Sequence, residues 1–410
     1  MKSPILLQIV IAAAADDYCG KSDIPKTTGS WNAEIQNVHV FFRHGARTDF
    51  HRTTCFPNKS QTRFSCSLTS EFSLVTSPSV SSRSRLSKSY KDGCQVGQLL
   101  DYAKIQMNRL AEYLKSTYAA IFTNATNKMY LRSTDTVRTL GSLDMLLGDL
   151  FASQSDPFVV HTQDTDSDAL IMGNQECELA NQLDSEFLSS KPFLAATTDS
   201  EYFKTCARMW KAEIGTDFNL NDSPDCLFAP ECAGVPLPNN LVPSKELSAC
   251  VSNIHSTVLQ IKYGAANSEW KQKGIQFCQL KIAPFLSDFY TLSQNASSAS
   301  SGLWATHDDT IACILAAMGA WDGIWPKYAG FVAFETHKSG AVRVLRDGIE
   351  IAWKDSIYLI VPPWMRNPNA YMNACRASQE SKGDYNISSI ISFTLKSFGL
   401  LAIAVILIII

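Results

Sequence analysis

Three segments that lie far apart in this chain share one layout, in which an apolar stretch typical of a buried strand is followed at once by charged or acid–base side chains. In the first, Val38-His39-Val40-Phe41-Phe42 precedes Arg43-His44-Gly45-Ala46-Arg47. The apolar run, rich in β-branched and aromatic residues, predicts a buried strand. Because ligand sites of open α/β sheets gather at the carboxyl ends of the strands, residues 43–47 are expected at such an edge.

The other two segments repeat this layout. Leu303-Trp304-Ala305-Thr306 predicts a strand with His307-Asp308 at its end, and an apolar helix is predicted over residues 310–318. One of the two aspartates at the start of this helix is expected to cap it. In the middle segment, Tyr130-Leu131 precedes an arginine-rich stretch at residues 132–139, and another helix is predicted to follow.

Each segment alone has a simpler explanation. A histidine after a strand is most often structural, an arginine-rich stretch can be a solvated helix start, and His-Asp before a helix is an ordinary cap. Together, in this order and setting, they would bring two histidines, three arginines and a carboxylic acid to one pocket. Hydrolysis of a phosphate monoester requires such a set, since guanidinium groups match phosphate geometry and histidine can act as a nucleophile.

The motifs resemble those of the histidine acid phosphatases, the branch of the histidine phosphatase superfamily that carries Arg-His-Gly-x-Arg and a later His-Asp pair. The resemblance runs from about residue 36 to about residue 365 and includes Gly97-Gln98-Leu99, Val159-Val160-His161-Thr162 and the stretch 325–335. It implies an α/β fold, with a mainly parallel sheet flanked by helices and a mainly helical cap inserted between the second and third active-site motifs.

Carried over residue by residue, the resemblance implies a phosphohistidine mechanism. His44 would be the nucleophile, and Asp308 would protonate the leaving alkoxide and then assist water. Three arginines and the second histidine would hold the phosphoryl oxygens: Arg43, Arg47, Arg138 and His307. No metal or other cofactor is implied, and the chain has no His-Glu-x-x-His or similar metal-ligand spacing. Since Asp308 must be protonated and His44 unprotonated, we expect activity to favour acidic pH.

The chain departs from the family pattern after its first motif, where Thr48-Asp49-Phe50 replaces a stretch that usually carries Pro. Loops tolerate such change, so we interpret Asp49 as a surface residue without a role. In the alternative interpretation, its charge weakens anion binding or pairs with a cationic group of the substrate.

Other features narrow the expected substrates to phosphate monoesters of small molecules or phosphoproteins. The related inositol-polyphosphate phosphatases typically carry His-Ala-Glu where this chain has His307-Asp308-Asp309. A phytase needs a strongly basic pocket, whereas this chain has a formal net charge of −3. A broad acid phosphatase is therefore expected, with a phytase or inositol phosphate phosphatase as the alternative. The Ser-rich stretch 60–89, a predicted surface insertion, lacks the charge and aromatic residues of a nucleic-acid-binding arm.

Two functions of other classes stay open. A mutase of the same superfamily would return the phosphoryl group to its substrate, although a secretory route and the second arginine, Arg47, argue against this. A non-catalytic surface protein could bind a phosphate ligand, although such a binder would have no reason to keep both His44 and Asp308. A homodimer is compatible with the sequence.

The N-terminal residues 1–15 predict a signal peptide, because one lysine is followed by an apolar centre and a small-residue exit. All 12 cysteines lie beyond it, so several disulfides are expected in an oxidising compartment. Cys313, inside an apolar helix, is interpreted as a free buried thiol. His39 and the tryptophans at 304, 321, 325 and 353 are interpreted as core residues. Sequons compatible with lumenal glycosylation stand at Asn58, Asn124, Asn221, Asn295 and Asn386.

The C-terminal residues 376–410 end in an apolar tail that fits either a membrane span or a glycolipid-anchor signal. Lys396 in the middle of the tail disfavours the span. In both cases the catalytic domain would be lumenal or extracellular, at the cell surface or in a lysosome-like compartment. Between the two ends we expect an α/β core formed by residues 16–147 and 301–375, with the mainly helical cap at residues 148–300.

Overall fold

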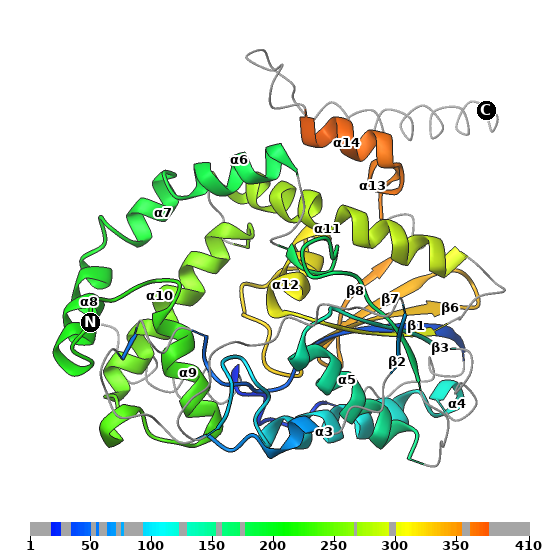
Figure 1. Ribbon diagram of the computed structural model, residues 1–410. Coiled ribbons are helices and arrows are strands. Elements are labelled where there is room, and N and C mark those ends of the chain that lie inside the picture. Colours follow the sequence, from blue (N-terminus) through cyan, green and yellow to red (C-terminus); the bar gives the residue numbers. More distant parts are fainter. Residues whose placement is uncertain are drawn as a thin grey trace, which may run out of the picture.

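The computed structural model of the protein describes residues 18–25, 34–50, 55–56, 64–70, 75–77, 93–122, 129–152, 158–172, 177–265, 269–294, 301–354 and 361–376. These residues form one eight-stranded mixed sheet with helices on both faces and a further group of helices to one side (Figure 1). The α/β class expected from the sequence is confirmed.

The sheet has the strand order β2-β4-β3-β5-β1-β6-β7-β8. The first five strands in this order are parallel to their neighbours, and the last three continue with antiparallel pairing. The strands are β1 (Ile35–Arg43), β2 (Val75–Ser77), β3 (Met129–Ser133), β4 (Val159–His161), β5 (Ser301–Thr306), β6 (Phe331–His337), β7 (Val342–Arg346) and β8 (Ile349–Lys354). The three motif strands predicted from the sequence, β1, β3 and β5, are neighbours, so their carboxyl ends meet at one edge.

The α-helices cover both faces of the sheet and extend beyond one edge (Figure 1). They are α3 (Tyr102–Thr117), α4 (Ala119–Phe122), α5 (Val137–Leu150), α6 (Glu178–Phe187), α7 (Lys191–Ala196), α8 (Glu201–Glu213), α9 (Ser223–Ala233), α10 (Lys245–Lys262), α11 (Lys271–Gln294), α12 (Asp308–Ala317), α13 (Pro363–Arg366) and α14 (Pro368–Arg376). Short 3₁₀ turns lie at η2 (Ser67–Ser70) and η4 (Pro238–Asn240).

Strand β1 is buried on both faces, because both sides of its pleat are apolar or aromatic. Val38, Val40 and Phe42 belong to the cluster formed with α3 and α5. Phe41 points to the opposite face, since successive side chains of a strand alternate. Its ring meets Phe285 of α11 edge-on, with centroids 5.2 Å apart. The first predicted strand therefore lies inside the sheet, which forms the central layer between helices on both faces.

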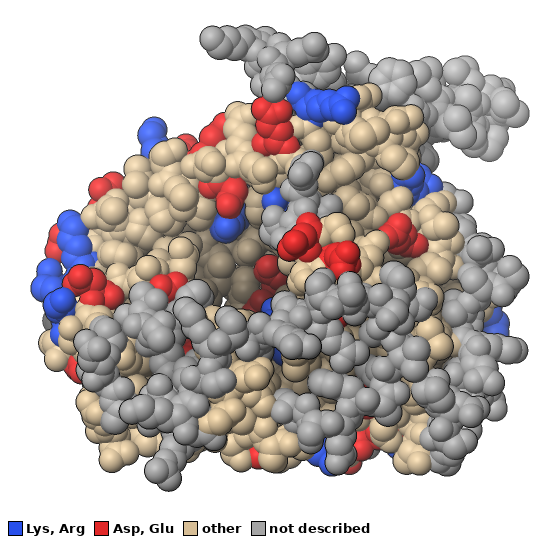
Figure 2. All heavy atoms as spheres, viewed as in Figure 1, with Lys and Arg blue, Asp and Glu red and all other residues tan. Residues whose placement is uncertain are grey.

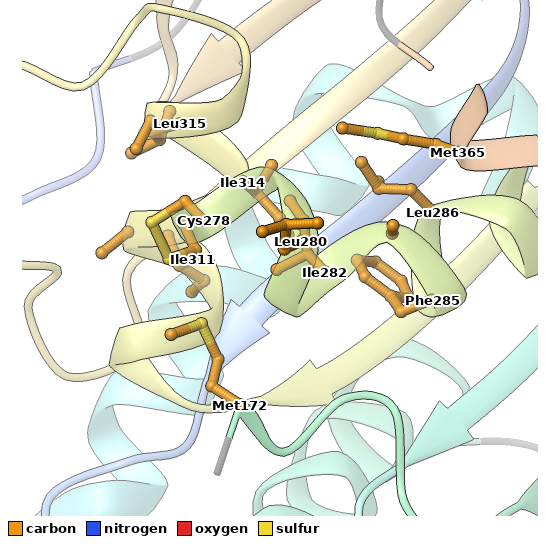
Figure 3. Close-up of a cluster of buried hydrophobic side chains, with 14 of the residues drawn as sticks. Met172, Cys278, Leu280, Ile282, Phe285, Leu286, Ile311, Ile314, Leu315 and Met365 are labelled. Atoms are coloured by element: carbon orange, nitrogen blue, oxygen red, sulfur yellow. A yellow bond between two sulfur atoms is a disulfide. The ribbon is translucent and has the colours of Figure 1, made fainter. Parts of the chain in front are cut away.

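The second face of the sheet is covered by α11 and α12, whose apolar side chains interdigitate (Figure 3). A disulfide between Cys278 of α11 and Cys313 of α12 joins the two helices. The interpretation of Cys313 as a free thiol is therefore wrong. Its partner stands 35 residues earlier on a neighbouring helix, and no sequence pattern indicates that adjacency.

Five further disulfides confirm the expectation that cysteines of this chain pair. They are Cys19–Cys232, Cys55–Cys226, Cys66–Cys94, Cys177–Cys375 and Cys206–Cys250. Six disulfides are typical of a protein that folds in an extracellular or lumenal compartment.

Helices α6 to α10 lie to one side of the sheet, in the region between the second and third motifs (Figure 1). Two elements of the same region belong to the sheet layers instead, since β4 pairs with β2 and β3, and α11 packs on α12. The division into a core and a cap at residue 148 stays a prediction.

Several predictions concern segments outside the described residues. They are the signal peptide, most of the Ser-rich stretch and the C-terminal tail beyond Arg376. Within the described part of the chain, no helix has both the length and the apolar character that crossing a membrane requires. Asn221 is the one described sequon, and its side chain is exposed.

Replacing Phe41 by Ala should lower the free energy of unfolding by about 3–5 kcal/mol, because the fully buried ring leaves a cavity between β1 and α11. Phe41→Leu should cost less than half of this, since it keeps most of the volume. Denaturant-induced unfolding with the disulfides intact measures the difference. Tyr202→Ala on α8, where the side chain is exposed, is the control and should change stability by about 0.5 kcal/mol or less. Equal losses in all three variants would contradict this assignment of the core.

Candidate active site

The carboxyl ends of β1, β3 and β5 are held side by side by backbone hydrogen bonds. The His44 N–H donates to the Thr306 carbonyl over 3.1 Å, and the Thr134 N–H donates to the Ala305 carbonyl over 3.3 Å. The first motif, the end of the second strand and the third motif therefore converge at one place. Figure 2 shows that this face of the molecule is hollowed, with acidic and basic atoms in the hollow.

The loop after β1 is seated on α3 and α5. The Ser142 hydroxyl accepts from the Gly45 N–H at 2.9 Å, and the Gln106 side chain accepts from the Ala46 N–H at 2.7 Å. A Cβ atom on Gly45 would stand 2.6 Å from the Cβ of Ala103, so only glycine permits this close approach to α3. These contacts fix the position of His44 relative to the carboxyl ends of the strands.

His44 is buried and held in one tautomer. Its Nδ1 lies 2.8 Å from the carbonyl of Gly45, which only accepts, so Nδ1 carries the proton and Nε2 carries the lone pair. Burial, followed by the charges of Arg138 and Arg43, holds the pKa of His44 well below its ordinary value of 6.5. The ring is therefore neutral at mildly acidic pH, with Nε2 available for attack.

Arg43 is completely buried and has a partner on each side. Its Nη2 lies 2.6 Å from Oδ2 of Asp308 and 3.1 Å from the hydroxyl of Tyr18, and its Nη1 donates to the Pro326 carbonyl at 2.8 Å. The guanidinium carbon lies 3.9 Å from the ring centre of Tyr328. These contacts fix the orientation of the guanidinium group beside His44.

Asp308 is the first residue of α12, and His307 occupies the N-cap position without a side-chain capping bond. Neither aspartate is the N-cap residue, although Asp308 Oδ1 accepts from the Asp309 N–H at 3.0 Å and Asp309 Oδ1 accepts from the Thr310 N–H at 2.8 Å, both in the first turn. The other oxygen of Asp308 accepts from the indole N–H of Trp325 at 3.2 Å and pairs with Arg43. Burial by itself would raise the pKa of Asp308, but the charges of Arg43 and then Arg47 outweigh it and the pKa lies below its ordinary value.

His307 lies between β3 and α5. Its Nδ1 is 3.3 Å from Nη2 of Arg138, which can only donate, so Nε2 carries the proton and donates to the Thr134 hydroxyl at 3.0 Å. Its ring centre lies 5.6 Å from that of His44. Burial and the charge of Arg138 lower the pKa of His307 well below 6.5. His307 is thus a second neutral imidazole in the same pocket.

The guanidinium groups of Arg47 and Arg138 share an aromatic neighbour. They lie 4.2 and 5.1 Å from the ring centre of Phe50, a residue of the stretch that replaces the family's usual Pro. Burial and the charge of Arg47 lower the pKa of Arg138 to about 10, so the group still carries its charge at neutral pH. All six site residues predicted from the sequence therefore gather in one pocket.

Asp49 lies in the same stretch and is fully buried, with no exposed surface. The interpretation of Asp49 as a surface loop residue is therefore wrong. The loop does not lie on the surface, because the Thr48 N–H donates to the Gln98 carbonyl at 2.8 Å and the loop is covered by the segment that leads into α3.

A family model described as the histidine phosphatase superfamily (branch 2) matches residues 34–345, which include all six of these site residues. The chain belongs to this family. Among curated relatives, lysophosphatidic acid phosphatase type 6 of Mus musculus is 23% identical over 334 residues, covering 74% of this chain and 76% of the relative. The 2-phosphoxylose phosphatase 1 of Homo sapiens is 23% identical over 383 residues, covering 83% of this chain and 76% of the relative.

Solved structures of similar shape include two enzymes named for inositol phosphates. The phytase of D. castellii gives a TM-score of 0.48 at 13% identity, covering 93% of this chain and 89% of that chain. The multiple inositol polyphosphate phosphatase of Bifidobacterium longum gives 0.49 at 10% identity, covering 82% and 92%.

Asp225 of α9 is a site residue that sequence reasoning missed. Its carboxylate lies 3.0 Å from Nη1 of Arg47 and accepts from the Phe50 N–H at 2.7 Å. It therefore fixes both the guanidinium group and the ring beneath it. The adjacent Cys226 is bonded to Cys55, which ties α9 to the segment after the first motif. A lone aspartate 178 residues away from Arg47 gives no signal of this in the sequence.

Trp325 is a second such residue. It was expected in the core with the other tryptophans, and Trp304 and Trp321 are indeed buried. Trp325 is half-buried and packs against the core cluster that contains these two tryptophans, but its N–H also donates to Asp308, which the core interpretation did not include. The side chain of Trp353 lies outside the described residues.

Replacing Asp225 by Ala should raise the inhibition constant of inorganic phosphate about tenfold, because Arg47 loses the charge-assisted contact that orients it. Asp225→Asn keeps an oxygen that can accept from the Phe50 N–H and removes the competing charge, so phosphate should bind it at least as well as the wild type. Competitive inhibition measures both constants. Asp217→Asn, at an exposed position just before α9, is the control. Tighter phosphate binding in both Asp225 variants would show that Asp225 only competes with the anion.

Proposed function

We propose that this histidine phosphatase is an acid phosphatase that hydrolyses phosphate monoesters through a phosphohistidine on His44. The observation that carries the proposal is the hydrogen bond from His44 Nδ1 to the Gly45 carbonyl, because it leaves the lone pair on Nε2 of a ring on which the charges of three guanidinium groups act. A carboxyl group, Asp308, lies in the same pocket, where it can deliver a proton.

In the first step, Nε2 of His44 attacks phosphorus in line with the departing ester oxygen. The P–N bond forms as the P–O bond breaks, and Asp308 in its acid form gives its proton to the leaving oxygen. Arg43, Arg47 and Arg138 balance the charge on the three equatorial oxygens throughout, so their preorganised positions lower the barrier. His307 accepts from Nη2 of Arg138 and thereby helps to place that guanidinium group beside the phosphoryl oxygens.

In the second step, water replaces the alcohol. Asp308, now a carboxylate, takes a proton from the water as its oxygen attacks phosphorus, and the P–N bond to His44 breaks. Inorganic phosphate leaves, His44 regains its lone pair and Asp308 regains its proton. The cycle uses one carboxyl group as acid and then as base, so its protonation state governs both halves.

The charges in the pocket favour substrates with a single phosphoryl group. Arg43 is paired with Asp308, Arg47 is paired with Asp225, and Arg138 donates to a neutral histidine. Two of the three guanidinium groups are thus offset by carboxylates of the protein itself. Little positive charge is left for further phosphates on the leaving group, so a phytase is the less favoured alternative.

We further propose that a signal peptide directs the chain into the secretory pathway and that the C-terminal tail anchors it, as a removable glycolipid signal or a membrane span. The disulfides support folding in an oxidising compartment. Either kind of anchor would leave the catalytic domain on that side of the membrane.

His44→Ala should lower the rate of p-nitrophenyl phosphate hydrolysis by at least about a thousandfold, since no other side chain replaces the nucleophile. Asp308→Asn should impair alkyl esters much more than p-nitrophenyl phosphate, whose leaving group departs without a proton. Labelled phosphate should be trapped on wild-type protein and not on His44→Ala. A wild-type chain that binds phosphate but neither turns over nor traps label would favour the non-catalytic binder. Transfer to an added alcohol in place of water would favour the mutase.

Hydrolysis should peak at acidic pH, with different profiles for kcat and kcat/KM. A bound phosphoryl group offsets the charges of Arg43 and Arg47, so the pKa of Asp308 should be higher in the complex than in the substrate-free site. The fall of kcat on the basic side should therefore lie at higher pH than that of kcat/KM. Because the pKa of His44 is far below 6.5, neither profile should fall near that value on the acidic side. A rate that rises into the alkaline range would contradict Asp308 as the proton donor.

A further inference from the structure

The contacts of Asp308 indicate which side chain lies nearest to the leaving group of a bound substrate. Its Oδ2 accepts from Nε1 of Trp325 at 3.2 Å and from Nη2 of Arg43 at 2.6 Å. Arg43 is fully buried on the phosphate side, whereas Trp325 is half-buried. If the ester oxygen must reach Asp308 to receive its proton, the group attached to that oxygen lies against Trp325.

Trp325 is held in place from behind by aromatic side chains. The ring of Tyr263 lies 6.0 Å away at an angle of 32°, and Trp321 meets it edge-on at 6.5 Å. Both of these rings are buried, with 5% and 7% of their surface exposed. The indole of Trp325 is therefore held rigidly by its neighbours, and its N–H edge faces Asp308.

His255 of α10 lies beside this indole. Its ring meets Trp325 edge-on with centroids 5.8 Å apart, and it is half-buried. The charged groups that act on it are Asp308, Asp225 and Arg43, all of which belong to the site. Burial lowers the pKa of His255 to about 4, so the imidazole is neutral under the conditions of catalysis and offers an aromatic edge rather than a cation.

We propose that Trp325 and His255 form the leaving-group subsite of this enzyme and that the subsite takes esters with a flat aromatic face, such as phenyl phosphate or phosphotyrosine. The inference rests on the proposed function, and Trp325 has two roles in it. Its ring is a platform for the leaving group, since stacked and edge-to-face arrangements of aromatic rings are favourable. Its N–H makes it a positioning residue for the Asp308 carboxylate.

The chemistry of the subsite also predicts which esters it should bind weakly. The two side chains of the subsite are aromatic, and His255 is neutral because burial lowers its pKa to about 4. Neither Trp325 nor His255 carries a positive charge that could hold a second phosphate or a carboxylate. Esters with an anionic leaving group should therefore bind less well than neutral aryl esters.

The test compares phenyl phosphate with glycerol 2-phosphate in the full chain. Trp325→Leu and His255→Ala should each lower the ratio of kcat/KM for the aryl ester over the alkyl ester, by about tenfold and about threefold. Trp325→Phe loses the same N–H contact to Asp308 as Trp325→Leu but keeps a ring, so its ratio should not fall below that of the wild type, and the ratio of Trp325→Leu should be about tenfold lower than that of Trp325→Phe. Ile324→Ala, an exposed neighbour in the same loop, is the matched control and should leave the ratio unchanged.

The inhibition constant of inorganic phosphate, which has no leaving group, separates this subsite from the phosphate pocket. It should stay within about twofold of wild type in all these variants, and that also shows that they fold. An unchanged ratio in Trp325→Leu, or a rise in the phosphate constant that accounts for the loss, would overturn the subsite. Wild-type hydrolysis of both esters with no aryl preference would overturn it as well and leave the proposed function standing. A wild-type chain that hydrolyses neither ester would overturn both.

Discussion

The ion pair between Arg43 and Asp308 is the interaction on which the rest of the site depends. A guanidinium group without exposed surface is strongly unfavourable unless it is paired and hydrogen-bonded. Its partner comes from the end of β5, and its other contacts come from the Pro326 carbonyl and the ring of Tyr328. The pair therefore fastens the ends of β1 and β5 and the segment before β6 into one unit. It also places Asp308, the proposed proton donor, next to an arginine proposed to bind the phosphoryl group.

The same pair explains the acid–base behaviour of the site. The arginines that would bind phosphate are the charges that keep Asp308 ionised while the site is empty of substrate. Binding of a phosphoryl group would weaken that influence, so the proton donor would become competent when the substrate arrives. The nucleophile needs no such change, since burial keeps His44 neutral. One set of guanidinium groups thus couples substrate binding to the protonation of the acid.

Helix α9 joins the helical region to this pocket both covalently and electrostatically. Two disulfides, Cys55–Cys226 and Cys19–Cys232, tie it to the segment after the first motif and to the N-terminal segment that carries Tyr18. Asp225 directly precedes Cys226 in the helix and holds Arg47. The covalent ties restrict how far the helix can move, so the orientation of Arg47 depends on residues that are remote in the sequence. Cross-links across such long loops also restrict the unfolded chain.

The sequence by itself determined the three motif strands, the order of the motifs and the six residues proposed for the site. These are local patterns: an apolar run such as Val38–Phe42 must be buried, and the polar residues after it then emerge at the sheet edge. Only the tertiary structure decided which single side chains complete the site. Asp225, Trp325 and His255 stand alone in a helix or loop, and Cys313 finds its partner on another helix, so no periodicity or spacing marks them. The burial of Asp49 has the same origin, because contacts between segments far apart in the chain decide which loops are covered.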